Sequence, residues 1–209
     1  MDALDTLMDA ALANIKTAVQ EKPKIEITEG MIMAQAQAMI TRGYLPYDRP
    51  AFRSLARWLA AIKAEATNKG LILSGAAGTG KTMFFKTVCD KRVLKTATIL
   101  KLWKQNNGTV PMNELYDLSE LEPMKFHVVI DELGEEPVGI TFGFREEVMS
   151  GVISHRYDVW KECGHRTYFT TNLAWAQLEE RYGRRITDRL REMCALVEFT
   201  GPSKRGSAT

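Results

Sequence analysis

The pattern of apolar residues divides the chain into a helical N-terminal piece and an alternating core. Within residues 3–20 apolar side chains recur at steps of three and four, which predicts an amphipathic helix with one apolar stripe. A second helix is predicted at residues 28–40, with Thr28 as its N-cap. A third, whose apolar residues fall within 52–62, leads into the core. We therefore place a domain boundary near residue 50.

Five apolar runs beyond this boundary predict the strands of a parallel sheet. The runs do not alternate strictly with polar residues, which is typical of strands that helices cover on both faces. The predicted strands are residues 71–74, 97–103, 126–131, 167–171 and 195–199. The predicted helices between them are residues 82–94, 142–161 and 174–182. Strands that alternate with helices indicate a doubly wound α/β fold.

A glycine-rich motif follows the first of these strands. Gly75-Ala76-Ala77-Gly78-Thr79-Gly80-Lys81-Thr82 is a complete G-x-x-x-x-G-K-[ST] sequence, and Met83 continues into the predicted helix. Glycines let the backbone turn so that its N–H groups point at a polyphosphate, and the helix directs its positive end at the same anion. Lys81 would contact the β and γ phosphates, and Thr82 would bind Mg²⁺. The motif predicts a nucleotide-binding loop; the alternative is an ordinary turn between strand and helix.

Two adjacent acids end the predicted strand 126–131. Asp131 and Glu132 stand at its carboxyl end, which is where ligands bind in open α/β sheets. Asp131 would hold Mg²⁺, mostly through water, and Glu132 would polarise the water that attacks the γ-phosphate. The pair favours hydrolysis over phosphoryl transfer to a metabolite. The alternative is a strand that merely stops at an acidic turn.

Two further groups of polar residues extend the candidate chemistry. Thr170-Thr171-Asn172 ends the next strand, where Asn172 would orient the lytic water or cap the following helix. Five arginines lie within residues 181–191. One of them, acting on the γ-phosphate of a neighbouring subunit, would neutralise transition-state charge, and we choose Arg189 with Arg185 as the alternative. Salt bridges along a helix or contacts to DNA phosphates would also account for these arginines.

Composition narrows the class of protein and its compartment. The chain has 209 residues, 45% hydrophobic and 26% charged, which is ordinary for one globular domain with a small extension. Its net charge of +2 does not by itself indicate a nucleic-acid binder. Three distant cysteines fit neither a disulfide framework nor a zinc site. Since no segment has the roughly 18 uninterrupted apolar residues of a membrane span, we expect a soluble cytoplasmic protein with no membrane partner.

The order of these motifs resembles the AAA+ ATPases of the DnaC/IstB group. The resemblance covers about residues 51–205 and rests on five segments: Gly75–Thr82, Val128–Glu132 with Leu133, Gly134 and Glu136 after it, Thr170–Asn172, Tyr182–Leu190 and Val197–Gly201. It implies an AAA+ core, which is a P-loop NTPase of the ASCE type, with five parallel strands in the order 5-1-4-3-2. It also implies ATP and Mg²⁺ as cofactors, and homo-oligomers in which one subunit's arginine completes the next subunit's site.

The resemblance assigns a role to each candidate residue. Lys81 and Thr82 are the Walker A pair, Asp131 and Glu132 the Walker B pair, Asn172 is sensor 1 and Arg189 is the arginine finger. The group often has Asp in place of the glutamate, so this chain departs from it in the direction of hydrolysis.

Two absences in the sequence also bear on the resemblance. Nine residues follow Thr200, so we expect a flexible tail at 201–209, no C-terminal lid domain and no sensor 2 arginine. Residues 1–50 contain no cysteine, which argues against a zinc-binding recognition domain.

Three functions stay open from the sequence. In the first, the protein is a DnaC-like helicase loader in DNA replication, which oligomerises with ATP on single-stranded DNA, contacts a replicative helicase and hydrolyses ATP slowly under stimulation by DNA or its partner. In the second, it is an IstB-like helper ATPase that coats duplex DNA and regulates a transposase. In the third, it is an ATP-gated binding module with negligible hydrolysis.

The distinguishing information is expected in the extension, residues 1–50. It holds five Lys or Arg against seven Asp or Glu, and its apolar stripe suits a protein partner better than DNA. The alternative is that residues 3–20 pack onto their own core. DNA contact would come from the core, where Lys101, Trp103 and Lys104 combine basic and aromatic character. The alternative is that these residues are a strand end with one buried tryptophan.

Overall fold

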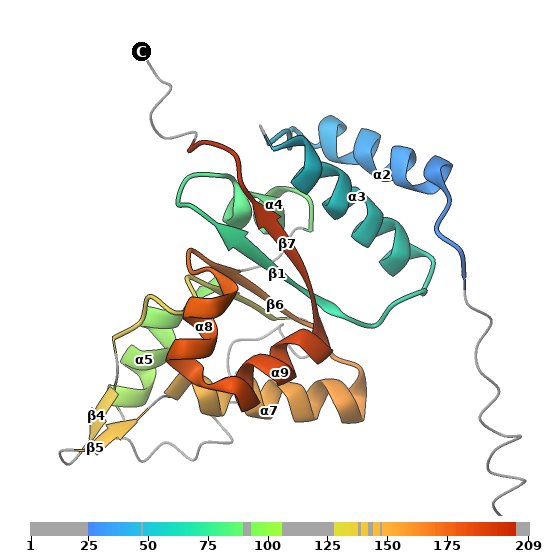
Figure 1. Cartoon of the computed structure of the whole chain (residues 1–209). Helices are drawn as coiled ribbons and strands as arrows, with labels where there is room; N and C mark the ends of the chain where they lie inside the picture. Colours follow the sequence, from blue (N-terminus) through green and yellow to red (C-terminus); the bar gives the residue numbers. More distant parts are fainter. Residues whose placement is uncertain are drawn as a thin grey trace, which may run out of the picture.

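Five parallel strands form the central sheet of the computed structural model (Figure 1). The structure describes residues 25–46, 48–89, 93–105, 128–137, 139–141, 144–146 and 148–203. The strands are β1 (Gly70–Gly75), β2 (Val93–Lys95), β3 (Val128–Asp131), β6 (Thr167–Thr171) and β7 (Cys194–Phe199). They lie in the order β2-β3-β6-β1-β7, and every neighbouring pair is parallel. Among the five core strands this order is 2-3-4-1-5, which confirms the predicted 5-1-4-3-2 read from the other edge.

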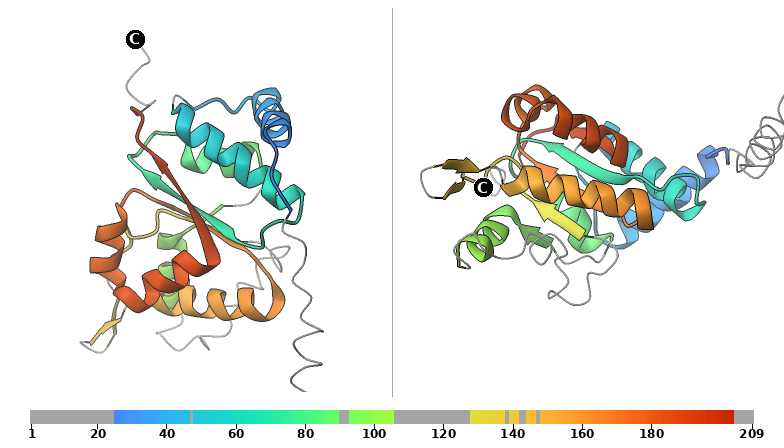
Figure 2. Two further views of the ribbon diagram at one scale, coloured as in Figure 1. Left: turned by 45° about the vertical axis from the view of Figure 1, so that its right-hand side comes forward. Right: turned by 90° about the horizontal axis from the view of Figure 1, so that it is seen from below.

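Helices cover both faces of this sheet. On one face lie α2 (Glu29–Thr41), α3 (Arg49–Lys63) and α4 (Lys81–Thr87), and on the other α5 (Thr96–Gln105), α7 (Val148–Cys163), α8 (Trp175–Tyr182) and α9 (Arg184–Met193). Figures 1 and 2 show α2 and α3 on the side of the sheet opposite to α7 and α9. Successive side chains of a strand point to opposite faces, so Leu71 and Leu73 pack with the first layer and Ile72 with the second. This arrangement explains why the strands read as continuous apolar runs.

The second and third of the helices predicted before the core form where expected, as α2 and α3. Thr28 caps α2 by accepting a hydrogen bond of 3.4 Å from the backbone N–H of Met31. In α2, Ile32 and Met39 are buried in the same hydrophobic cluster as the sheet residues Leu71 and Leu73. The described part of the extension therefore shares a core with the sheet. The predicted helix at 3–20 lies outside the described residues, and the boundary near residue 50 stays a prediction.

The predicted second strand was wrong. Residues 97–103 belong to α5, and the strand is the three-residue β2 that precedes it. Ile99, Leu100 and Trp103 are buried on one side of this helix, and a short apolar run does not distinguish a buried helix from a strand. Because Trp103 is only 2% exposed, it cannot stack on DNA bases, and the alternative of a buried tryptophan is confirmed.

Other boundaries also differ from those predicted. The helix after the glycine-rich motif ends at Thr87 instead of residue 94. Residues 142–161 were predicted as one helix, but α7 begins at Val148, after an antiparallel hairpin of β4 (Gly139–Thr141) and β5 (Phe144–Glu146). The basic stretch near the C-terminal end forms α9, a helix that the periodicity did not predict. Within the described ranges, no helix has the length and hydrophobicity that a membrane span requires.

Candidate active site

The glycine-rich motif forms the turn between β1 and α4. Gly75 has a φ of 135°, and a Cβ atom there would lie 2.3 Å from the carbonyl oxygen of Phe199 in the neighbouring strand. Gly80, which precedes α4, has a φ of 100° in the left-handed region. Side chains disfavour both conformations, and the first position also has no room for one. These two glycines therefore determine the path of the loop.

Lys81 is held inside this loop by oxygen atoms. Only 6% of the residue is exposed. Its Nζ donates to the carbonyl oxygens of Gly75 at 2.5 Å and Ala76 at 2.8 Å, and to Oδ1 of Asn172 at 2.7 Å. Thr79 Oγ1 donates to the same carbonyl of Ala76 at 2.9 Å. The loop therefore presents a buried ammonium group, and these three acceptors carry no formal charge.

Asp131 lies at the end of β3 beside the first turn of α4. Asp131 is only 3% exposed, and its Oδ1 accepts hydrogen bonds from Thr82 Oγ1 at 2.7 Å and Thr170 Oγ1 at 2.5 Å. Burial of a carboxylate is costly unless hydrogen bonds satisfy it, and these two hydroxyls do so. The hydroxyl and carboxylate oxygens that meet here are the kinds of ligand that Mg²⁺ prefers. The predicted metal pair is thus brought together.

Glu132, the next residue, has an unusual backbone conformation. Its φ is 64°, which is rare for a residue with a side chain. The conformation is held by its N–H, which donates to Thr170 Oγ1 at 3.0 Å, and by its carbonyl, which accepts from Thr96 Oγ1 at 3.2 Å. Its carboxylate is half-buried, and both of its oxygens lie 3.2 Å from Nζ of Lys95 at the end of β2. The carboxylate is therefore paired with a cation that the sequence did not identify.

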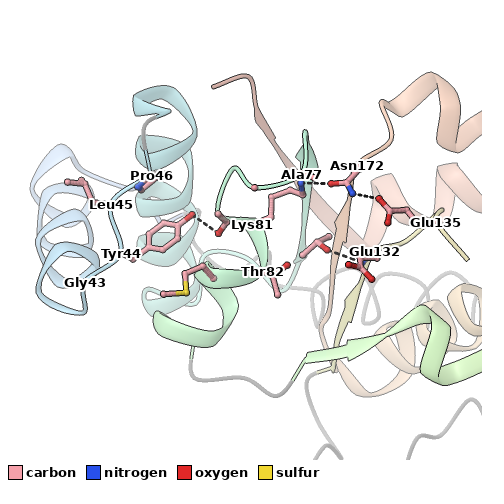
Figure 3. Close-up of a pocket in the computed structure, with 14 residues that line it drawn as sticks. Gly43, Tyr44, Leu45, Pro46, Ala77, Lys81, Thr82, Glu132, Glu135 and Asn172 are labelled. Atoms are coloured by element: carbon pink, nitrogen blue, oxygen red, sulfur yellow. Dashed lines mark hydrogen bonds between the residues drawn. The ribbon is translucent and has the colours of Figure 1, made fainter. Parts of the chain in front are cut away.

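Asn172 connects the loop to the turn that follows Glu132. Its side chain accepts from Lys81 and donates to the carboxylate of Glu135. Figure 3 shows it between these two residues. The alternative role, capping the next helix, does not apply, because the N-cap residue of α8 is Ala174.

These side chains surround a pocket of about 460 Å³. Eight of its lining residues were predicted as site residues: Ala77, Gly78, Gly80, Lys81, Thr82, Met83, Glu132 and Asn172. Of the other predicted residues, Gly75 and Ala76 contact Lys81, Thr79 contacts Ala76, and Asp131 contacts Thr82. Sequence reasoning missed six lining residues as members of a site: Gly43, Tyr44, Leu45, Pro46, Glu135 and Thr170. Among these, Thr170 stood beside Asn172 in the motif quoted for that strand.

The connector between α2 and α3, residues 43–46, forms the wall of the pocket opposite the acids (Figure 3). Tyr44 is buried, its hydroxyl donates to the carbonyl of Gly80 at 3.4 Å, and its ring packs edge-on to Phe84 with centroids 5.4 Å apart. Burial raises the pKa of its phenol above the ordinary range. No motif marks this connector, because its role depends on how α2 and α3 pack.

Asp48 anchors the same connector to the end of the sheet. Its Oδ1 caps α3 by accepting from Ala51 N at 2.9 Å. Its Oδ2 accepts from Thr200 N at 2.6 Å, Thr200 Oγ1 at 3.0 Å and Gly201 N at 2.9 Å. Burial alone would raise the pKa of this carboxyl, but the hydrogen bonds from Ala51, Thr200 and Gly201 outweigh it and lower the pKa.

Neither candidate arginine lines the pocket of its own chain. The guanidinium of Arg189 lies over the ring of Tyr157 in α7, 5.1 Å from its centroid, and Arg185 is exposed. Asp188 pairs with Arg184 at 3.7 Å and with Arg191 at 4.0 Å, so salt bridges along the helix account for those two arginines. The structure therefore assembles the loop, the acids and Asn172, and places Arg185 and Arg189 outside that assembly.

Comparison with known proteins rests on the structure. No protein-family model and no curated protein sequence matches the chain. Among solved structures, DnaI is similar with a TM-score of 0.55 and 24% identity over 75% of this chain and 88% of that one. The DnaC helicase loader is similar with a TM-score of 0.54 and 19% identity, over 83% of this chain and 100% of that one. The fold is that of the P-loop AAA+ domains. A replication initiator DnaA bound to AMPPCP and single-stranded DNA has a TM-score of 0.53 and 12% identity, over 85% of this chain and 52% of that one. Identities this low carry the AAA+ fold and nothing finer.

Proposed function

We propose that the protein is an ATPase that binds ATP and Mg²⁺ in the pocket between the glycine-rich loop and the ends of β3 and β6. The observation that carries this proposal is the convergence of Lys81, Thr82, Asp131, Glu132 and Asn172, which come from three separate segments, on one edge of the sheet. A pocket of about 460 Å³ also lies within the range of small-molecule sites.

The phosphates and the base of ATP would each meet a surface that suits them. The loop residues 75–83 would bind the phosphates, and Lys81 would exchange its carbonyl acceptors for phosphate oxygens, which bind an ammonium group more strongly. On the base side, Leu45 and Met83 are 61% and 54% exposed beside the pocket. Two large apolar side chains in water are unfavourable, and a planar base between them would cover both.

Hydrolysis would depend on the acids and Asn172. Thr82 and Asp131 would hold Mg²⁺, which when bound supplies positive charge next to the phosphates. Glu132 would polarise the attacking water, and Asn172 would orient it. For this role Glu132 must leave Lys95, to which it is paired in the described state.

The arginine that completes the site would come from a second copy of the chain. Arg189, with Arg185 as the alternative, lies on α9 away from the chain's own pocket. An arginine at the transferring phosphoryl group stabilises its transition state, so a homo-oligomer formed with ATP would be the active form.

The biological role that we favour is cytoplasmic helicase loading in DNA replication on single-stranded DNA. The similarity to DnaI and to the DnaC helicase loader supports it. A protein partner is also favoured by α2, where Met33 and Ile40 are 61% and 45% exposed on the same side, one heptad apart. An IstB-like helper that regulates a transposase is the alternative, and an ATP-gated binding module is the second alternative.

Turnover separates an ATPase from an ATP-gated module. We expect wild-type protein to hydrolyse ATP faster with single-stranded DNA than without it, and a Glu132→Gln protein to bind ATP normally but to lose activity at least about 100-fold. The matched control is Glu162→Gln, which removes an exposed carboxylate at the end of α7. If wild type and Glu132→Gln hydrolyse ATP equally slowly with and without DNA, the protein is an ATP-gated binding module and the ATPase proposal is wrong.

Capture of candidate partners by the full chain separates the two biological roles. The full chain is needed because Ile32 and Met39 share their core with the sheet, so an isolated 1–50 fragment would expose them. We expect a replicative helicase to bind wild-type protein and to bind a Met33→Lys, Ile40→Lys protein more weakly. Binding to a transposase and not to the helicase would support the alternative role.

A further inference from the structure

We propose that Glu136, together with Arg181 and Tyr182, positions α9 so that its arginines reach the site of a neighbouring copy. The proposal rests on the ATPase and the arginine in trans proposed above. None of the three residues lines the pocket, so their effect on the reaction would pass through the helix that follows them.

Glu136 is a buried carboxylate with partners on two elements. The residue is 4% exposed, and its Oε2 accepts from the N–H of Gly134 at 2.9 Å. Its Oε1 accepts from the hydroxyl of Tyr182 and lies 3.2 Å from Nη2 of Arg181. A buried charge needs several such partners, because an unsatisfied carboxylate in the interior is strongly unfavourable. The residue therefore joins its own turn firmly to the end of α8.

The side chain of Arg181 binds the backbone of the same turn. Its Nη1 donates to the carbonyl of Gly134 at 2.7 Å, and its Nη2 donates to the carbonyl of Glu136. A guanidinium that contacts two carbonyls and one carboxylate fixes orientation as well as distance, which a lysine would not do. The turn at 133–136 and the last turn of α8 thus form one hydrogen-bonded unit.

This unit is also attached to the proposed γ-phosphate end of the pocket. The carbonyl of Leu133 accepts from Thr171 Oγ1 at 2.7 Å, directly before Asn172. Glu135, in the same turn, accepts from Asn172, which in turn accepts from Lys81. A change at Lys81 and Asn172 when phosphate binds would therefore act on the turn that Glu136 belongs to.

The arginine helix α9 begins immediately beyond this unit. Tyr182 ends α8, Gly183 follows with a φ of 79°, and Arg184 begins α9. A Cβ atom at Gly183 would meet nothing within 4 Å, so the glycine serves its backbone conformation and not close packing. Because one residue separates the two helices, the orientation of α8 at Tyr182 determines where α9 starts.

A mixing experiment distinguishes this positioning role from general support of the fold. Donor subunits carry Glu132→Gln, so their own site is silent but their α9 is intact. Acceptor subunits carry Arg189→Ala, so their own site keeps Glu132 but they give no arginine. An equal mixture should hydrolyse ATP several-fold faster than either variant alone, because about a quarter of its sites combine an intact Glu132 with a donated Arg189.

The test is to add Tyr182→Phe to one partner at a time. We expect it to lower the recovered rate about fivefold when the donor carries it, because the hydrogen bond to the charged Glu136 that orients the donor's α9 is lost. The rate should be unchanged when the acceptor carries it. Glu136→Gln should act in the same direction with a larger loss. The control is Glu180→Gln in the donor, an exposed carboxylate on the same helix, which should change nothing.

Each result decides one claim. An equal loss with donor and acceptor, or no loss with either, overturns the positioning role while the arginine in trans stands. If the simple mixture recovers no activity although both variants bind ATP, the arginine in trans is wrong and the positioning role falls with it. Cooperative thermal unfolding of the Tyr182→Phe protein at the wild-type temperature shows that its fold is intact.

Discussion

The glycine-rich loop and the arginine helix α9 carry the same kind of charge in opposite surroundings. Lys81 is 6% exposed and has three oxygen acceptors within 2.8 Å. On α9, by contrast, the side chain of Arg184 is 85% exposed, and the guanidinium of Arg189 rests on a tyrosine ring. The loop is organised by its own chain before any ligand arrives. Arg184 and Arg185 are exposed and Arg189 is half-buried against Tyr157, so most of the charge of this helix faces outward, as expected if its target belongs to another copy.

The largest expected effect tests the loop side of this comparison. Lys81→Ala should weaken ATP binding by about 100-fold or more, because a buried charge-assisted contact to phosphate is lost. The measurement is titration of the protein with ATP and Mg²⁺ by calorimetry. Lys86→Ala, which removes an exposed lysine from the same helix, is the control and should bind normally. Equal binding by the two variants would mean that the pocket does not hold phosphate at the loop.

The second effect tests the helix side. Arg189→Ala should bind ATP as wild type does and should hydrolyse it about 30-fold more slowly, since an arginine that acts in the transition state contributes to rate and not to ground-state binding. The measurement is the steady-state rate at saturating ATP, over a range of protein concentrations.

Two companion variants sharpen the result. Arg185→Ala identifies the finger if it shows the larger loss, and Arg191→Ala, at the other end of α9, should keep full activity. If Arg189→Ala lowers ATP affinity as much as it lowers the rate, α9 serves its own chain and the contrast with the loop disappears.

The same contrast explains which features could be predicted from the sequence. The meeting of Lys81, Thr82, Asp131 and Glu132 at one edge of the sheet could be predicted, because phosphate and metal chemistry needs given residue types at given spacings and these types stand next to the ends of apolar strands. The strand order followed from the family resemblance. These are properties that a local stretch of sequence carries with it.

The features that were missed depend on packing between distant segments. The connector 43–46 becomes a pocket wall because α2 and α3 share a core with β1. Lys95 meets Glu132 because β2 is parallel to β3 with those strand ends in register. β2 itself has three residues, too few for a periodic signal, so the longer apolar run in the following helix was taken as the strand.

A third prediction concerns the anchor of the pocket wall. Asp48→Asn should lower the free energy of unfolding by about 1–2 kcal/mol at pH 7, since asparagine still caps α3 but accepts weaker hydrogen bonds from Thr200 and Gly201. The measurement is urea unfolding, with Asp158→Asn, an exposed acid on α7, as the control.

The pH dependence of this difference follows from the pKa. Because the folded state lowers the pKa of the Asp48 carboxyl, its stabilisation is fully present above the unfolded value near 4 and is lost as the pH falls through the lower folded value. The gap between wild type and Asp48→Asn should therefore close in acid. A gap that stays constant down to pH 3 would contradict this assignment. Weaker ATP binding by Asp48→Asn at neutral pH would also show that the pocket beside the glycine-rich loop depends on Asp48.

The smallest expected effect lies at the half-exposed carboxylate of Glu132, which is less buried than Lys81 in the loop and less exposed than Arg184 on α9. Glu132 is paired with Lys95, and their side chains are 38% and 57% exposed, so the pair contributes at most about 1 kcal/mol. Lys95→Gln should release the carboxylate toward the attacking water and raise ATP hydrolysis without DNA by about threefold, with ATP affinity unchanged. Lys101→Gln, on the exposed side of α5, is the control. Since salt screens exposed pairs, the difference between Lys95→Gln and wild type should shrink as the ionic strength rises. A lower rate in Lys95→Gln would instead mean that Lys95 contacts the phosphates during hydrolysis. The edge strand β2 would then contribute a residue to the site.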